Sequence, residues 1–183
     1  MCKELEEKLA YHSAPALCGI KPSNLINISN NSLHKVLSDI KSLNEIYNPN
    51  NCFQILKKTD SGILLLVYKK KKLEEYLFLD DNRSYLESIG YKRSDYIDDY
   101  IYELKRRIND NEIFPHEIGL FLGYDLDDTL EFIKGNKKPL LKGVWNVYSK
   151  KEEKRILFEK YYRCRDCVVR LVNKGFSIEN FMK

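Results

Sequence analysis

The sequence predicts an α+β protein, with one domain over residues 1–183 and a small, partly antiparallel sheet packed by several helices. Segments 52–56 and 63–68 are both apolar, and the turn between them contains Gly62, which is typical of an antiparallel hairpin. Segments with the helical spacing of apolar residues lie before and after this hairpin. No repeat, low-complexity linker or domain boundary interrupts the chain. These observations together favour an α+β domain.

The N-terminal part is predicted to hold two helices and a strand. The first helix covers Lys3 to Tyr11 and ends before Ala14-Pro15, because a residue that precedes proline is disfavoured in the α region. Residues 18–22 indicate a turn, and residues 24–28 a short strand. Ser32 is predicted to cap the second helix, whose inward face carries Leu33, Val36, Leu37, Ile40 and Leu43.

The strand at 63–68 is apolar on both faces, so we expect it at the centre of the sheet. Helices are then predicted at 69–79 and at 83–89, the latter ending at Gly90. Ser94 is expected to open a longer helix, and another runs from Asp125 through Ile133. Residues 144–148 alternate like a strand, and the last helix runs from about Lys151 to Asn173.

Composition limits the class of protein. The chain is 43% hydrophobic and 32% charged, as soluble globular proteins are. No apolar run reaches the length of about 18 residues that spans a membrane. The acidic N-terminus lacks the apolar core of a signal peptide, which predicts a cytoplasmic protein. Five cysteines form no disulfide framework, so we expect reduced thiols.

The formal net charge of +4 does not by itself indicate a nucleic-acid partner. It is the difference between 31 basic and 27 acidic residues, and the two signs are interleaved. Lys57-Lys58 and the run Lys69–Lys72 could form a basic edge for phosphate or RNA. Such runs more often lie in solvent and protect a sheet edge. Nucleic-acid binding is therefore not favoured.

The most distinctive stretch of the sequence is Phe114-Pro115-His116-Glu117-Ile118-Gly119-Leu120-Phe121-Leu122-Gly123-Tyr124. Together with Asp128, Phe132-Ile133, Gly143 and Trp145, it resembles the signature of a bacterial domain-of-unknown-function family, number thirty-seven ninety-three. That family is found largely in anaerobic Gram-positive bacteria. The resemblance implies little about chemistry, since the family is uncharacterised. The sequence departs from the family pattern at Ser13, where a cysteine often follows the residue matching His12, and at Asp125, which replaces a proline.

Two interpretations compete for the start of this segment. Pro115 suits the first turn of a short buried helix, and Glu117 could cap its exposed backbone donors. On the functional interpretation, His116 acts as a base, a hydrogen-bond donor or a metal ligand at the start of that helix. A binding pocket would then be completed by Lys21, Arg107, Tyr124 and Tyr148.

The cysteines suggest two further chemistries. Cys164-Arg165-Asp166-Cys167 is a CxxC that could support thiol redox chemistry or metal binding. It has no second ligand pair, and Cys164 falls on the apolar stripe of the last helix, so packing explains it. A cysteine–histidine hydrolase built on Cys18 and His116 is conceivable, although nothing around either residue marks a nucleophile.

Three functions remain open from the sequence alone. The first is a protein that binds, and in one version transforms, a small molecule or cofactor of anaerobic metabolism around His116 and Glu117. The second is a non-enzymatic interaction or regulatory module that uses an exposed face at Trp145 and Tyr148, or the basic hairpin. The third is a thiol redox or metal protein using Cys164 and Cys167. The sequence specifies neither a cofactor nor a substrate.

Overall fold

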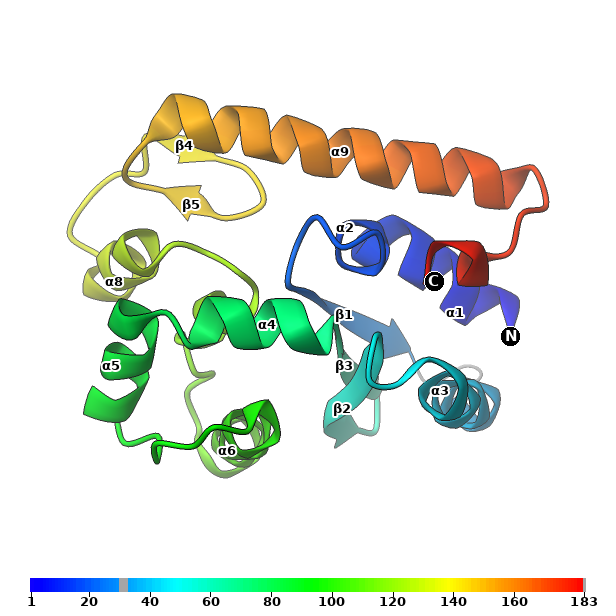
Figure 1. Cartoon of the computed structure of the whole chain (residues 1–183), viewed down its shortest axis with the longest axis horizontal. Coiled ribbons are helices and arrows are strands. Elements are labelled where there is room, and N and C mark those ends of the chain that lie inside the picture. The colour runs from blue at the N-terminus through cyan, green and yellow to red at the C-terminus, as the bar shows by residue number, and fades with distance from the viewer. Residues whose placement is uncertain (30–32, 183) are drawn as a thin grey trace.

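The computed structural model, which describes residues 1–29 and 33–182, has the predicted α+β architecture (Figure 1). Its centre is a three-stranded antiparallel sheet of β1 (Ser23–Ser29), β2 (Cys52–Thr59) and β3 (Gly62–Tyr68), in the order β1-β3-β2. The predicted hairpin and the central place of its second strand are both confirmed. The predicted cap Ser32 lies outside the described residues.

Helices cover both faces of the sheet because β3 is apolar on both. Successive side chains of a strand point to opposite faces. Accordingly, Ile63, Leu65 and Val67 enter one buried cluster, and Leu66 and Tyr68 enter another.

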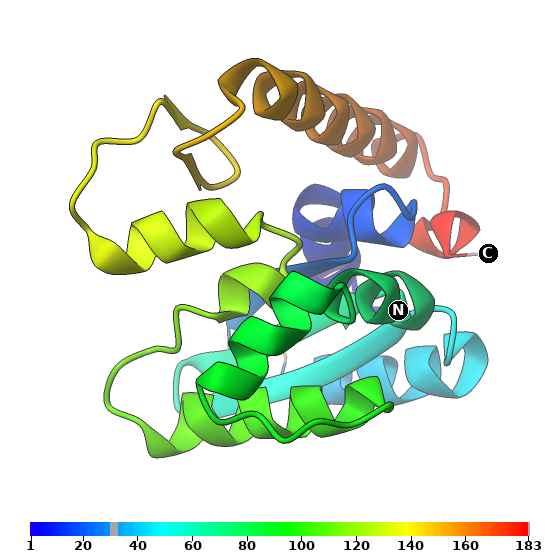
Figure 2. The same ribbon diagram turned by 60° about the vertical axis from the view of Figure 1, so that its left-hand side comes forward.

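The first cluster joins the N-terminal helices to the C-terminal part of the chain (Figure 2). Leu5, Leu17, Ile40, Val168 and Ile178 all contribute to it, although they come from distant parts of the sequence. The elements on this face are α1 (Lys3–Lys8), the π-helical turn η1 (Leu9–Ser13), α2 (Ala14–Leu17), α3 (Leu33–Tyr47), the second half of α9 (Lys151–Asn173) and the 3₁₀ turn η3 (Ile178–Phe181).

The second cluster lies on the opposite face and uses a continuous part of the chain. Its helices are α4 (Lys70–Leu77), α5 (Asp80–Ser88), α6 (Ile97–Asp110) and α7 (Ile118–Phe121). A third, smaller cluster of Trp145, Val147, Phe158 and Tyr161 packs the hairpin of β4 (Leu141–Lys142) and β5 (Asn146–Val147) against the first half of α9. α8 (Leu126–Lys134) lies beside this hairpin in Figure 1.

Several predicted boundaries are wrong. The helix predicted at 83–89 begins at Asp80, and the strand predicted at 52–56 continues to Thr59. The first helix does not end before Ala14-Pro15, because the π-helical turn η1 carries it on and Pro15 then occupies the first turn of α2, where proline needs no amide donor. Ser94 does not open α6, which begins at Ile97, since the Ser94 hydroxyl accepts instead from the Tyr96 amide. The strand predicted at 144–148 is only Asn146–Val147.

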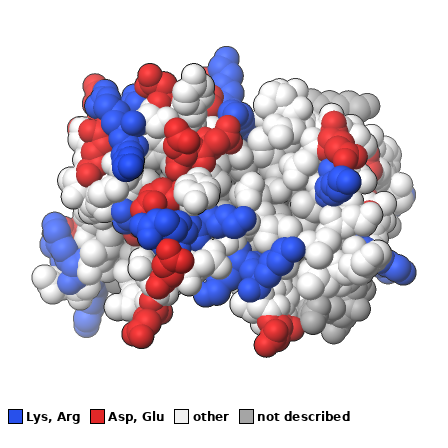
Figure 3. All heavy atoms as spheres, turned by 90° about the horizontal axis from the view of Figure 1, so that it is seen from below, with Lys and Arg blue, Asp and Glu red and all other residues white. Residues whose placement is uncertain are grey.

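The surface carries both signs of charge. The face seen in Figure 3 has basic and acidic side chains close together on one half, with a run of basic side chains across its middle. Within the described residues, no helix is both long enough and apolar enough to cross a membrane.

Candidate functional site

A cavity of about 290 Å³ lies where the most distinctive segment of the sequence meets α8 and the β4–β5 hairpin. Its walls come from four places along the chain, and most of them are apolar or aromatic. The lining residues are His116, Ile118, Gly119, Tyr124, Asp128, Thr129, Phe132, Gly143, Trp145 and Asn146.

Asp128 holds the walls of this cavity together. Its side chain is buried, with 1% exposed, and both carboxylate oxygens accept hydrogen bonds. One oxygen accepts from the Trp145 indole N–H at 2.8 Å, and the other accepts from the Tyr148 and Ser149 amides at 2.7 and 3.1 Å. Charge-assisted hydrogen bonds are about twice as strong as neutral ones. Asp128 therefore fixes α8 to the hairpin and to the start of α9.

The Thr129 hydroxyl is the unusual group of the cavity wall. Thr129 is 5% exposed, and its Oγ1 has no hydrogen-bond partner among the described residues. A buried hydroxyl without a partner costs free energy, so such groups are rare and call for an explanation. Gly119 faces it: a Cβ at Gly119 would lie 3.0 Å from Thr129 Oγ1 and 3.2 Å from Tyr124 Cδ2. The absence of a side chain at Gly119 therefore allows α7 to lie this close to the hydroxyl.

Aromatic rings form the rest of the wall. Tyr124 stacks on Trp145 with ring centroids 4.7 Å apart, and Phe158 meets Trp145 edge to face at 4.5 Å. At the mouth, the exposed His116 ring packs edge to face against Phe132 at 5.4 Å. Because Trp145 is covered by ring contacts, it is 8% exposed and is not available for docking on a partner.

Glu117 and Arg107 lie together, but away from the cavity. The prediction that Glu117 caps the short helix is wrong, since α7 has no side-chain cap. The buried Glu117 carboxylate instead accepts from Arg107 at 3.2 Å and from the Tyr91 hydroxyl at 3.3 Å. Arg107 also pairs with Glu103 at 2.8 Å and donates to the Ile89 carbonyl at 2.7 Å. These contacts join α5, α6 and α7 and leave neither side chain lining the cavity.

Lys21 lies behind the cavity wall. It is 2% exposed, and its Nζ is 5.3 Å from the centroid of the Tyr124 ring. No carboxylate of residues 1–29 or 33–182 forms an ion pair with it. Burial lowers the pKa of Lys21 to about 7. Of the proposed pocket residues, His116 and Tyr124 line the cavity, Lys21 contacts its wall, and Tyr148 contributes a backbone amide.

Cys164 and Cys167 both lie on α9, as the sequence predicts. Cys18 interacts with Cys164, whereas His116 packs on Phe132, so the structure does not bring the hydrolase pair together. Cys167 is exposed on the next turn of α9. Across the described part of the chain, no group of three or more His, Cys, Asp or Glu side chains could hold a metal ion.

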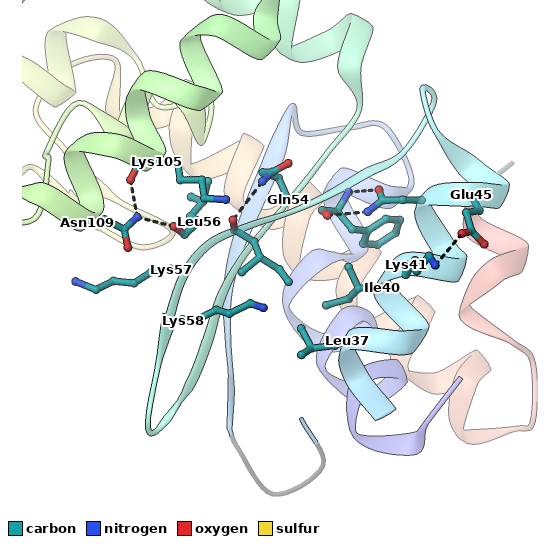
Figure 4. A pocket seen from close by; sticks show the side chains of 13 residues that line it. Leu37, Ile40, Lys41, Glu45, Gln54, Leu56, Lys57, Lys58, Lys105 and Asn109 are labelled. Atoms are coloured by element: carbon teal, nitrogen blue, oxygen red, sulfur yellow. Dashed lines mark hydrogen bonds and ion pairs between the residues drawn. The ribbon is translucent and has the colours of Figure 1, made fainter. Parts of the chain in front are cut away.

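A second, more open groove of about 810 Å³ follows the outer edge of β2, between α3 and α6 (Figure 4). The Asn44 amide both donates to and accepts from the Phe53 backbone at 2.9 Å, and Asn109 donates to the Leu56 carbonyl at 2.8 Å. These hydrogen bonds use backbone groups of β2 that could otherwise pair with a further strand. The charged side chains along the groove are Lys41, Glu45, Lys57, Lys58 and Lys105.

Fold and site together define an α+β protein with a small aromatic cavity at one end of its longest helix. Residues 9–182 match the family described as "Protein of unknown function (DUF3793)", and because the match covers most of the chain, the protein belongs to that family. The resemblance noted from the sequence is thereby confirmed. No curated protein and no solved structure matches the chain.

Sequence reasoning missed Thr129 and Asn146 as cavity residues, treated Asp128 only as a family marker, and placed Trp145 on an exposed face rather than in a cavity wall. One signal was present. Thr129 directly follows Asp128, and Asn146 directly follows Trp145, so each missed residue is next to a residue that matches the family. However, nothing local to the sequence shows that α8 and the hairpin meet.

Proposed function

We propose that the protein binds a small organic molecule in the cavity between α7, α8 and the β4–β5 hairpin. The observation that carries this proposal is the cavity itself, whose largely apolar and aromatic wall contains the unpartnered hydroxyl of Thr129. Ligand sites are mostly apolar with a few convergent polar groups, and this cavity has that composition. At about 290 Å³ it suits a compact ligand.

The lining favours a neutral ligand. None of the lining residues is a lysine or arginine, so no cation is placed to bind a phosphate or carboxylate group. The only lining carboxylate, Asp128, already accepts three hydrogen bonds. A planar ring with one group that can hydrogen-bond to Thr129 would satisfy both the aromatic walls and the free hydroxyl.

Chemistry on such a ligand would depend on His116. It is the only imidazole among the lining residues, and its exposed position at the mouth allows proton exchange with solvent. The proposal includes a cytoplasmic location and a role in anaerobic metabolism. All five cysteines are free thiols, which is usual in a reducing compartment.

The single tryptophan gives a direct test, because Trp145 lines the cavity. A panel of neutral one-ring and two-ring heteroaromatic fragments is titrated while Trp145 fluorescence and fragment NMR signals are followed. We expect at least one fragment to bind. Thr129→Val should weaken binding roughly 3- to 10-fold, the effect of one neutral hydrogen bond.

Thr59→Val is the matched control, because Thr59 is exposed at the end of β2, and it should leave binding unchanged. The proposal fails if no fragment alters the fluorescence, or if Thr129→Val and wild type bind the same fragment equally.

The second candidate is an interaction module that binds an acidic partner in the groove beside β2. Four lysines against one glutamate favour an acidic segment there. Because Asn44 and Asn109 occupy backbone groups of β2, the partner would be held by lysine side chains rather than as an added strand. A fluorescent oligoglutamate should bind with an affinity that falls as salt rises, and Lys58→Ser should weaken it. Salt-independent binding, or none, would count against this candidate.

A further inference from the structure

The fold brings Cys18 and Cys164 together, although 146 positions separate them in the sequence. Cys18 directly follows α2, and Cys164 lies on α9, which runs over α2 (Figures 1 and 2). Cys164 packs against the buried cluster that contains Ala14 and Leu17. Leu17, the residue before Cys18, belongs to that cluster, and the two thiols lie close enough for each to shift the pKa of the other.

The two thiols differ in access and acidity. Cys18 is exposed, whereas Cys164 is half-buried. The Lys69 and Lys72 side chains pass beside the adjacent Gly19, 3.4 and 3.5 Å from where its Cβ would be. The hydrogen bond from Cys164 lowers the pKa of Cys18 to about 7, with the Lys69 charge acting in the same direction against desolvation. The same hydrogen bond raises the pKa of Cys164.

This is the environment of a reactive cysteine with a second thiol in reach. An attacking thiol works best when its pKa is near the ambient pH, and an electropositive, accessible site supplies that condition. Cys18 therefore has the properties of the attacking thiol, and Cys164 those of the resolving thiol.

We propose that Cys18 and Cys164 form a reversible disulfide by exchange with a low-molecular-weight disulfide. The Cys18 thiolate attacks one sulfur of that molecule, forms a mixed disulfide and releases one thiolate. That thiolate takes the Cys164 proton, and the Cys164 sulfur then attacks the Cys18 sulfur and releases the second thiolate, which is protonated by solvent. One small disulfide is reduced to two thiols, and one protein disulfide forms.

The bridge would link α2 to the centre of α9. A crosslink restricts the unfolded chain, more so for a long loop, so the oxidised protein should unfold at a temperature about 5–15 °C higher than the reduced one. This inference is independent of the ligand proposed for the cavity.

The experiment equilibrates the reduced full-length chain with mixtures of reduced and oxidised glutathione, quenches with an alkylating agent and maps the peptides by mass spectrometry. We expect a Cys18–Cys164 link in wild type and in Cys167→Ser. Cys164→Ser should stop with one glutathione on Cys18, and Cys18→Ser should form no bridge. A Cys164–Cys167 link, a bridge lost in Cys167→Ser, or no oxidation in wild type would each overturn the proposal.

A second measurement is the rate at which iodoacetamide alkylates Cys18 at pH 7. Without the Cys164 hydrogen bond, the pKa of Cys18 rises, so a smaller fraction of Cys18 is thiolate at pH 7. Each thiolate that remains is a stronger nucleophile. The rate in Cys164→Ala, which has no hydrogen-bond donor at this position, should be roughly sixfold lower than in wild type. Circular dichroism establishes that this variant is folded. If it does not fold, the comparison of wild type with Cys18→Ser and Cys167→Ser still decides the pairing.

Discussion

Replacing Lys21 by methionine should remove a specific pH dependence of stability. The side chain is 2% exposed and has no ion-pair partner among the described residues, so the folded state disfavours its charged form. Burial lowers its pKa from the ordinary 10.5 to about 7. Methionine has a similar length and no charge, so it retains packing while removing the titration.

The direction and the size of this pH dependence of stability follow from proton linkage. Between pH 7 and pH 10.5 the unfolded chain holds a proton on Lys21 that the folded chain has lost, so the free energy of unfolding rises with pH in this window. With the pKa at about 7 when folded, the gain between pH 7 and pH 9 is about 2 kcal/mol. Below pH 7 both states are protonated, and the full cost of burying the ammonium group remains.

The assay is urea denaturation followed by Trp145 fluorescence at pH 7 and pH 9. Cys18 titrates in the same window, but it is present in both proteins and cancels in the difference. Lys21→Met should therefore lack about 2 kcal/mol of the rise seen in wild type. Lys92→Met, which changes an exposed lysine, should keep the wild-type rise. Equal pH dependence in wild type and Lys21→Met would refute the assignment of a neutral buried amine.

Two further substitutions test the walls of the cavity. Gly143→Ala should cost about 1–3 kcal/mol in urea denaturation, because its Cβ would lie 2.4 Å from Phe158 Cδ2. Combining it with Phe158→Leu should then cost less than the sum of the two single changes, and strict additivity would contradict the predicted clash. Asp128→Asn should cost about 1–3 kcal/mol and shift the Trp145 emission, because an amide cannot accept from every donor around it. An unchanged emission spectrum would show that Asp128 does not hold the indole.

The predictable parts of the fold are those encoded by local periodicity. The unbroken apolar run of β3 identified the central strand, and regular spacing gave the bounds of α9. The π-helical turn at Leu9–Ser13 could not be foreseen, because proline alone argues for a helix end there. The two-residue strands β4 and β5 are too short to carry a pattern of their own.

The site was less predictable than the fold because its contacts are between distant elements. His116 and Tyr124 were identified from one distinctive segment, and both line the cavity. Glu117 resembled a cap because of its distance from Pro115, yet the guanidinium of Arg107 provides a stronger partner across the helix interface. The proximity of Cys18 to Cys164 depends on α2 packing on α9, which neither segment specifies alone.

The two faces of the sheet differ in when they can be completed during synthesis. The buried side chains of the second cluster lie between residues 52 and 122, and Leu25, Tyr124 and Leu126 pack against them, so that face can pack once residue 126 has left the ribosome. The other face also needs Ile178 and Met182, which are buried against the N-terminal helices, and the Ile178 amide donates to Glu6 at 3.0 Å. The apolar side of α1 and α3 therefore stays partly exposed until Ile178 and Met182 are synthesised, more than a hundred residues later. On a growing chain, that side is where a chaperone would find exposed surface longest.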